Sequence, residues 1–221
     1  MRTPFRNRQE AGKQLAAELA ARHYPNPIVL ALPRGGVPVA YEIARELHAP
    51  LDVCVVRKLG VPGQPELAMG AITHGVTLLD NGLIQALGIS QAAVDAAIAA
   101  ETAELERRER TYRAGAAPLD VGGRTVIIVD DGLATGATMR AAVRAIRALR
   151  PARIVAVVPV GAADTCALLR TEADDVVCLA TPEPFRAVGL WYSSFPQTSD
   201  REVLELLQQQ PASDGHGPRT A

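Results

Sequence analysis

Apolar residues fall along this chain in two alternating kinds of segment. Short unbroken apolar runs, typical of buried strands, occupy residues 28–32, 51–56, 126–129, 154–160 and 176–180. Apolar positions with helical spacing predict helices at residues 8–22, 37–47, 137–149, 162–170 and 200–207. Apolar strands that alternate with helices predict an α/β fold, a doubly wound and mainly parallel sheet buried on both faces.

The region between the second and third of these strands has a different pattern. Residues 68–73 and 76–79 predict a strand pair that turns at His74 and Gly75, and Ser90 is a suitable N-cap for a long helix to Arg113. Glutamate–arginine pairs four residues apart are typical of a solvated helix face. We expect one domain over residues 1–210, with its parts as follows: core 28–180, helical insertion 81–113, C-terminal segment 181–210 and a flexible tail 211–221.

Composition narrows the classes of function. The chain is 48% hydrophobic, as an ordinary globular core requires, and 23 basic against 24 acidic residues give a net charge of −1. This balance disfavours a nucleic-acid partner, and no apolar run approaches the length of about 20 residues that crosses a bilayer. The three cysteines form no C-x-x-C pair, so neither a disulfide framework nor a zinc site is indicated. We expect a cytoplasmic protein that acts on small molecules.

The strongest chemical signal lies after the strand at residues 126–129. Two adjacent carboxylates, Asp130 and Asp131, end this strand, and a small hydroxyl-rich loop opens the next helix. Adjacent buried carboxylates repel each other unless donors or a cation lie nearby, whereas a helix N-terminus favours an anion. The pattern suits a phosphorylated sugar. The alternative is that both acids only cap the helix, with Gly132 and Gly136 shaping the turn.

This segment resembles the signature of the type I phosphoribosyltransferases, which is an apolar strand, two acidic residues and a T-G-x-T loop. The resemblance covers about residues 28–180, and the chain as a whole is similar to bacterial phosphoribosyltransferases of unassigned substrate. It implies that Asp130 and Asp131 hold the ribose hydroxyls of phosphoribosyl pyrophosphate (PRPP) and act on Mg²⁺, largely indirectly. It also implies a 5′-phosphate loop made of Ala134, Thr135, Gly136, Ala137 and Thr138.

Two further segments match the family. Arg34, Gly35 and Gly36 follow the first strand, where the family has its pyrophosphate loop, although R-G-G alone is more often a plain tight turn. Arg57 and Lys58 end the second strand, where members carry basic residues that contact pyrophosphate. Lys58 is one of only two lysines in the chain, and the alternative is a chance surface lysine. A mobile loop is expected at 59–67, with Glu66 as a candidate for proton handling. The implied catalytic residues are Arg34, Lys58, Glu66, Asp130 and Asp131.

The acceptor is less well defined. In hypoxanthine-guanine-type members an acidic residue precedes T-G-x-T, and Ala134 at that position argues against a 6-oxopurine handled in that way. Adenine- and orotate-type members tolerate a small residue there. The segment 181–210 corresponds to the family's hood over the base, with Trp191, Tyr192 and Phe195 as candidates for stacking. The alternative is that these rings form a small satellite core.

The sequence therefore predicts a Mg²⁺-dependent transfer of a phosphoribosyl group from PRPP to a nitrogen nucleophile, expected to be a nucleobase. The resemblance implies a homodimer, and no membrane partner is expected. A regulatory protein that binds PRPP without turnover is the alternative, and hydrolysis or transfer on another phosphorylated sugar is a third possibility. An α/β-hydrolase is disfavoured because the chain has no G-x-S-x-G motif.

Overall fold

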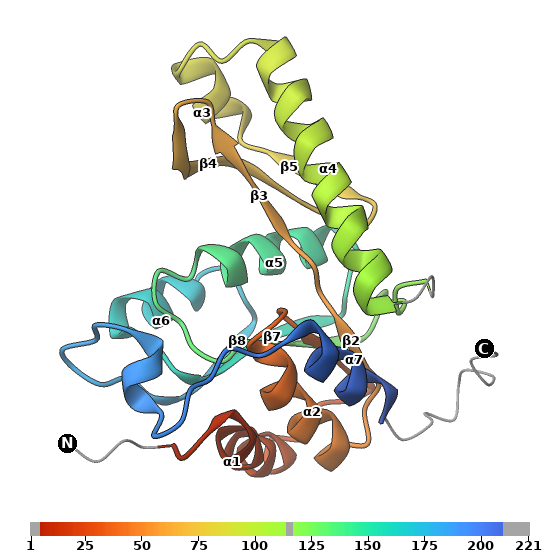
Figure 1. Cartoon of the computed structure of the whole chain (residues 1–221), viewed down its shortest axis with the longest axis vertical. Helices are drawn as coiled ribbons and strands as arrows, with labels where there is room; N and C mark the ends of the chain where they lie inside the picture. Colours follow the sequence, from red (N-terminus) through yellow and green to blue (C-terminus); the bar gives the residue numbers. More distant parts are fainter. Residues whose placement is uncertain (1–4, 114–116, 210–221) are drawn as a thin grey trace.

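The protein is built around a five-stranded parallel sheet in the strand order β2-β1-β6-β7-β8 (Figure 1). The computed structural model describes residues 5–113 and 117–209, without the side chains of Pro65 and Glu66. The strands are β1 (Pro27–Ala31), β2 (Leu51–Val53), β6 (Thr125–Val129), β7 (Arg153–Val160) and β8 (Asp175–Ala180). Each predicted apolar run is a strand, although β2 ends three residues earlier than expected.

Helices cover both faces of this sheet, as the doubly wound prediction requires. They are α1 (Arg8–Ala20), α2 (Gly36–Glu46), α5 (Ala137–Ala148), α6 (Ala163–Leu169) and α7 (Asp200–Gln208). Alternate residues of β1 supply opposite faces: Val29 and Ala31 pack with α1 and α2, whereas Ile28 and Leu30 pack with α5 and α6. The carboxyl ends of β1 and β6 lie side by side, because Ala31 pairs with Val129. This edge carries the candidate chemistry.

A second, antiparallel sheet rises from the main body together with a long helix (Figure 1). It has the order β3-β4-β5, and the elements of this region are β3 (Arg57–Val61), β4 (Gln64–Thr73), β5 (Val76–Leu79), α3 (Asn81–Ala86) and α4 (Gln91–Arg113). The β4–β5 turn at His74 and Gly75 and the long helix are confirmed, and the Ser90 hydroxyl accepts a hydrogen bond from the Ala93 amide at 3.3 Å.

One expectation about this region is wrong. Residues 59–67 are not a loop but most of a β-hairpin, in which β3 and β4 are joined at Pro62 and Gly63. Gly63 has a φ of +77°, which the turn requires and glycine allows. The side chains of Leu59 and Met69 are fully buried, so apolar burial holds the strands in place despite the glycines and proline between them. The helical insertion predicted at 81–113 consists of two helices, the short α3 and the long α4.

The tail predicted as flexible, 211–221, lies outside the described residues. Within the described ranges, no helix has both the length and the apolar character that crossing a bilayer demands.

Candidate functional site

The two carboxylates of Asp130 and Asp131 lie at the carboxyl end of β6, the central strand of the main sheet. The Asp131 amide donates a hydrogen bond to Oδ1 of Asp130 at 2.8 Å. Burial raises the pKa of Asp130 well above its ordinary value, and repulsion from Asp131 adds to the rise. Hydroxyl donors or a cation bound at this position would favour the charged form of the pair.

Arg8, at the start of α1, is the residue of this site that the sequence did not reveal. Its Nε donates to Oδ2 of Asp131 at 2.8 Å, and its Nη1 donates to the Pro196 carbonyl at 2.6 Å. Burial raises the pKa of Asp131, and the Arg8 guanidinium opposes that rise. The only sequence signal for this role is an arginine in the first turn of a helix, where the helix dipole disfavours a positive charge.

The loop between β6 and α5 is hydrogen-bonded to the rest of the protein at its start, and residues near its end are exposed to solvent. The Leu133 amide donates to the Val160 carbonyl at 2.8 Å, and the Thr165 hydroxyl donates to the Ala134 carbonyl at 2.7 Å. Gly136 is the N-cap of α5 with a φ of +71°, and no described side chain caps the helix. Thr135, Ala137 and Thr138 are exposed. A 12-residue helix thus presents uncapped amides and two exposed threonines, the setting that favours a phosphate.

The loop that carries Gly35 and Gly36 packs directly against the carboxylates. The Leu32 amide donates to the Val129 carbonyl at 2.8 Å, which ties the loop to the end of β6. A Cβ atom on Gly35 would overlap the Asp131 carboxylate, and one on Gly36 would lie 2.5 Å from the Val129 carbonyl oxygen. Only glycine allows this close approach of two backbones. The predicted pyrophosphate loop, carboxylates and phosphate loop therefore meet at one edge of the sheet.

The basic residues predicted for pyrophosphate are not gathered at this edge. The Arg34 side chain lines a cavity shared with α4 and α7. Arg57 Nε donates to Glu101 of α4 at 2.6 Å, whereas Lys58 lines a cavity of about 680 Å³ between the small sheet and α5. Adjacent residues of a strand point to opposite faces, so Arg57 and Lys58 serve different surroundings. The side chain of Glu66 lies outside the part of the chain that the structure describes.

The three aromatic candidates form part of a cluster next to the carboxylates. Tyr192 is buried, and its hydroxyl donates to the Asp131 carbonyl at 2.6 Å. Phe195 stacks on Tyr192 with ring centroids 4.8 Å apart, and the Arg8 guanidinium lies 3.7 Å over the Phe195 ring. Trp191 Nε1 is buried, and no described group accepts its hydrogen. The cluster packs on Phe5, at the ends of β7 and β8.

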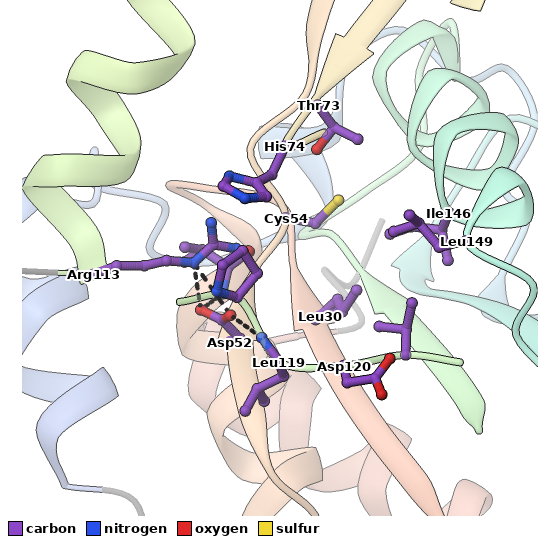
Figure 2. Close-up of a pocket in the computed structure, with 13 residues that line it drawn as sticks. Leu30, Asp52, Cys54, Thr73, His74, Arg113, Leu119, Asp120, Ile146 and Leu149 are labelled. Atoms are coloured by element: carbon purple, nitrogen blue, oxygen red, sulfur yellow. Dashed lines mark hydrogen bonds and ion pairs between the residues drawn. The ribbon is translucent and has the colours of Figure 1, made fainter. Parts of the chain in front are cut away.

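A separate cavity of about 330 Å³ lies beside β2 and the carboxyl end of α5 (Figure 2). Cys54 lines it, and burial raises the pKa of its thiol to about 12. The thiol is therefore protonated near neutral pH and is a poor nucleophile. No predicted site residue with a described side chain lines this cavity, which we do not assign to the candidate chemistry.

Comparison with known proteins agrees with the geometry. Residues 7–190 match the model of the phosphoribosyl transferase domain. The crystal structure of TT1426 from Thermus thermophilus is 39% identical, covers 95% of this chain and 99% of its own, and superposes with a TM-score of 0.87. AQ2163 from Aquifex aeolicus shares the fold alone, at 13% identity and a TM-score of 0.50, over 90% of this chain and 86% of its own.

A curated protein of Mycobacterium tuberculosis strain H37Rv, named "Putative phosphoribosyl transferase Rv0571c", is 49% identical over 206 residues, or 93% of this chain. Those residues make up 46% of the mycobacterial protein, so the chain spans about half the length of the curated relatives that it matches. The domain match extends over most of the chain and includes the two carboxylates and both loops. The chain belongs to the type I phosphoribosyltransferase family.

Proposed function

We propose that the protein transfers the phosphoribosyl group of PRPP to a nitrogen nucleophile and releases pyrophosphate. The observation that carries the proposal is the meeting of three features at the end of β6: the carboxylate pair, the Gly35–Gly36 backbone and the uncapped start of α5. Family membership supports PRPP-dependent transfer in general. The nucleobase acceptor is the finer part of the proposal.

Each part of the edge has a distinct task in this reaction. The 5′-phosphate would accept hydrogen bonds from the amides and hydroxyls of residues 134–138, and Asp130 and Asp131 would accept the ribose hydroxyls. The acceptor nitrogen supplies an electron pair to C1 while the C1–O pair leaves with pyrophosphate. The Gly35 amide would stabilise the charge that develops on pyrophosphate, whereas the Gly36 amide already donates to the Leu32 carbonyl at 3.1 Å. Arg57 and Lys58 would reach pyrophosphate only if the β3–β4 hairpin turned toward this edge, and Arg34 faces the cavity beside α4 and α7 instead. The acceptor proton passes to a base, for which Glu66 is the candidate.

The carboxylate pair also suits Mg²⁺. Burial raises the pKa of both carboxyls, so a nearby cation would favour their charged forms, and carboxylate oxygens are ligands that Mg²⁺ prefers. No group of three or more acidic, histidine or cysteine side chains among the described residues could hold a metal ion. We therefore assign Asp130 and Asp131 an indirect role toward an ion carried mainly by substrate oxygens and water. Such an ion would neutralise the charge of the leaving pyrophosphate.

Arg8 links donor binding to acceptor binding. It covers the Asp131 carboxylate and the Phe195 ring at the same time. Ribose hydroxyls that bind Asp131 would compete with Arg8, and departure of its guanidinium would free a ring face on which a flat base can stack. Trp191 and Tyr192 would support that ring rather than stack themselves. The homodimer and the cytoplasmic location expected from the sequence stay predictions.

The proposal is tested by measuring pyrophosphate release from PRPP and Mg²⁺ across purine and pyrimidine bases, with a control that lacks base. We expect release with one base and a loss of at least about 100-fold in Asp131→Asn, since the variant removes the charge that faces the ribose. Asp120→Asn, which alters an exposed turn carboxylate, is the matched control and should retain full rate.

Other outcomes separate the alternatives. Release without any base would indicate hydrolysis. Calorimetric binding of PRPP with no release across the panel would support a regulatory protein, and the absence of both would contradict the proposal.

A further inference from the structure

A polar cavity of about 400 Å³ lies where the Arg34 loop, the inserted helix α4 and the start of α7 come together. Its walls are almost entirely polar, and apart from Pro33 the described residues that line it are Arg34, Arg107, Arg108, Thr111, Tyr112 and Asp200. These residues come from three parts of the chain that are far apart in sequence. The proposed transfer assigns no task to α4.

The cavity has an excess of positive charge. Three guanidinium groups face it against the single carboxylate of Asp200, which accepts a hydrogen bond from the Tyr112 hydroxyl at 2.6 Å. Glu104, one turn earlier on α4, binds both Arg107 and Arg108 at 2.7 Å and neutralises one charge. In the described part of the chain, no carboxylate pairs with Arg34.

The electrostatic surroundings of Tyr112 show that these groups lie close together. Burial raises the pKa of the Tyr112 hydroxyl to about 12, and the charges of Arg108 and Arg34 oppose that rise. The hydroxyl therefore stays protonated near neutral pH and keeps its bond to Asp200. The arginines of α4 and of the loop thus act on the same small volume.

We propose that this cavity is a second anion site, which binds a phosphate-bearing small molecule while PRPP occupies the edge of the main sheet. Guanidinium groups on several sides suit a phosphate, because each offers paired donors to its tetrahedral oxygens. The placement of PRPP in this statement rests on the proposed function.

The site would be coupled to PRPP through the loop. Arg34 immediately precedes Gly35 and Gly36, which pack on Asp131 and Val129. An anion held by Arg34 would restrict the loop in the arrangement that faces the carboxylates. By linkage, PRPP and the second anion would then raise each other's affinity by the same factor.

The test is calorimetry on the full chain saturated with PRPP and Mg²⁺, titrated with inorganic phosphate and, separately, with adenosine monophosphate. We expect one equivalent of at least one probe to bind, and the probe with the higher affinity shows whether the site prefers a free phosphate or a phosphate ester. The double variant Arg107→Ala/Arg108→Ala should weaken this binding at least about 10-fold while its affinity for PRPP alone is unchanged. Arg110→Ala, on the same helix with a side chain 71% exposed, should bind the probes like the wild type.

Three results would overturn the second site: no binding of either probe, probe binding that survives the double variant, or loss of PRPP affinity by the same factor as probe affinity. If PRPP itself does not bind the wild type, the proposed function fails. The same probes are then titrated into the protein alone, where the double variant decides the cavity separately.

Discussion

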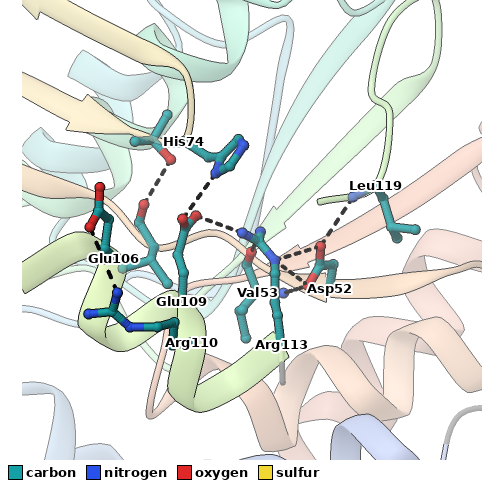
Figure 3. Close-up of polar contacts among 10 residues, drawn as sticks. Asp52, Val53, His74, Glu106, Glu109, Arg110, Arg113 and Leu119 are labelled. Atoms are coloured by element: carbon teal, nitrogen blue, oxygen red, sulfur yellow. Dashed lines mark hydrogen bonds and ion pairs between the residues drawn. The ribbon is translucent and has the colours of Figure 1, made fainter. Parts of the chain in front are cut away.

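The main sheet and the insertion that follows β2 are held in place by different forces. All five residues of β6 are buried, whereas α4 buries only Val94, Leu105 and Tyr112 of its 23 residues. Polar contacts add to these few side chains in fixing α4 on the body. Arg113 of α4 binds Asp52 of β2 at 3.2 Å and donates to the Val53 carbonyl at 2.7 Å, and Glu109 of the same helix holds Arg113 at 2.6 Å (Figure 3).

The main sheet and α4 should therefore respond differently to the loss of a single polar side chain. Burial of apolar surface is non-directional and is spread over many side chains. The main sheet should therefore lose little stability when one polar side chain is changed. An ion pair is directional and involves only two side chains. We therefore expect the placement of α4 to depend on single residues. The variants below test this contrast.

The largest effect is expected from Arg113→Met. The side chains of Arg113 and Asp52 are only 9% and 8% exposed, so the variant leaves a buried carboxylate without its partner. We expect the free energy of unfolding to fall by about 3 kcal/mol in urea titrations. Arg110→Met, at an exposed ion pair of the same helix, should change it by less than about 0.5 kcal/mol. Equal values for the two variants would show that ion pairs do not hold the insertion.

Gly36→Ala tests the frame at the candidate site. The new methyl group would lie 2.5 Å from the Val129 carbonyl oxygen and 3.0 Å from the Asp130 Cα, both of which belong to the buried backbone. The loop must move away from the carboxylates, and we expect pyrophosphate release to fall about 100-fold, or about 2.7 kcal/mol in the activation barrier. Gly82→Ala, where the nearest atom is an Asp80 oxygen at 3.4 Å, is the control. Full activity in Gly36→Ala would contradict the close packing.

Asp130→Asn should change the free energy of unfolding least, and should raise it, whereas Arg113→Met lowers it. Because the pKa of Asp130 is raised in the native state, the native protein binds this proton more tightly than the unfolded chain does. The free energy of unfolding therefore falls as pH rises from about 3.9, the ordinary value, through the raised one. The variant removes this loss and keeps an oxygen that can accept the Asp131 amide.

For Asp130→Asn we expect a higher Tm at pH 7, with no gain at pH 3, and lost transfer activity. In a chain of this size about 1 kcal/mol corresponds to about 2–4 °C. A Tm at pH 7 below that of the wild type would mean that the carboxylate stabilises the fold.

The five-stranded sheet could be predicted from the sequence, because its strands are buried on both faces and so form unbroken apolar runs. The carboxylate pair was visible for the same reason, since two acids directly after such a run are conspicuous. The β3–β4 hairpin was not predicted, because Gly60, Pro62 and Gly63 interrupt its pattern.

Contacts between residues that are far apart in the sequence could not be predicted, because only the folded chain brings them together. Arg8 and Asp131 are 123 positions apart, and no local pattern pairs them. Likewise, the separation of Arg34, Arg57 and Lys58 into different surroundings depends on the direction of each side chain.

The alternation of side chains along β3 has a mechanical consequence. Arg57 forms an ion pair with Glu101 on the α4 side, and the next residue, Lys58, faces the α5 side. A rotation of the hairpin that carries Lys58 toward the start of α5 would pull on the Arg57–Glu101 pair. Such a rotation would therefore be limited by the Arg57–Glu101 ion pair, which joins β3 to α4.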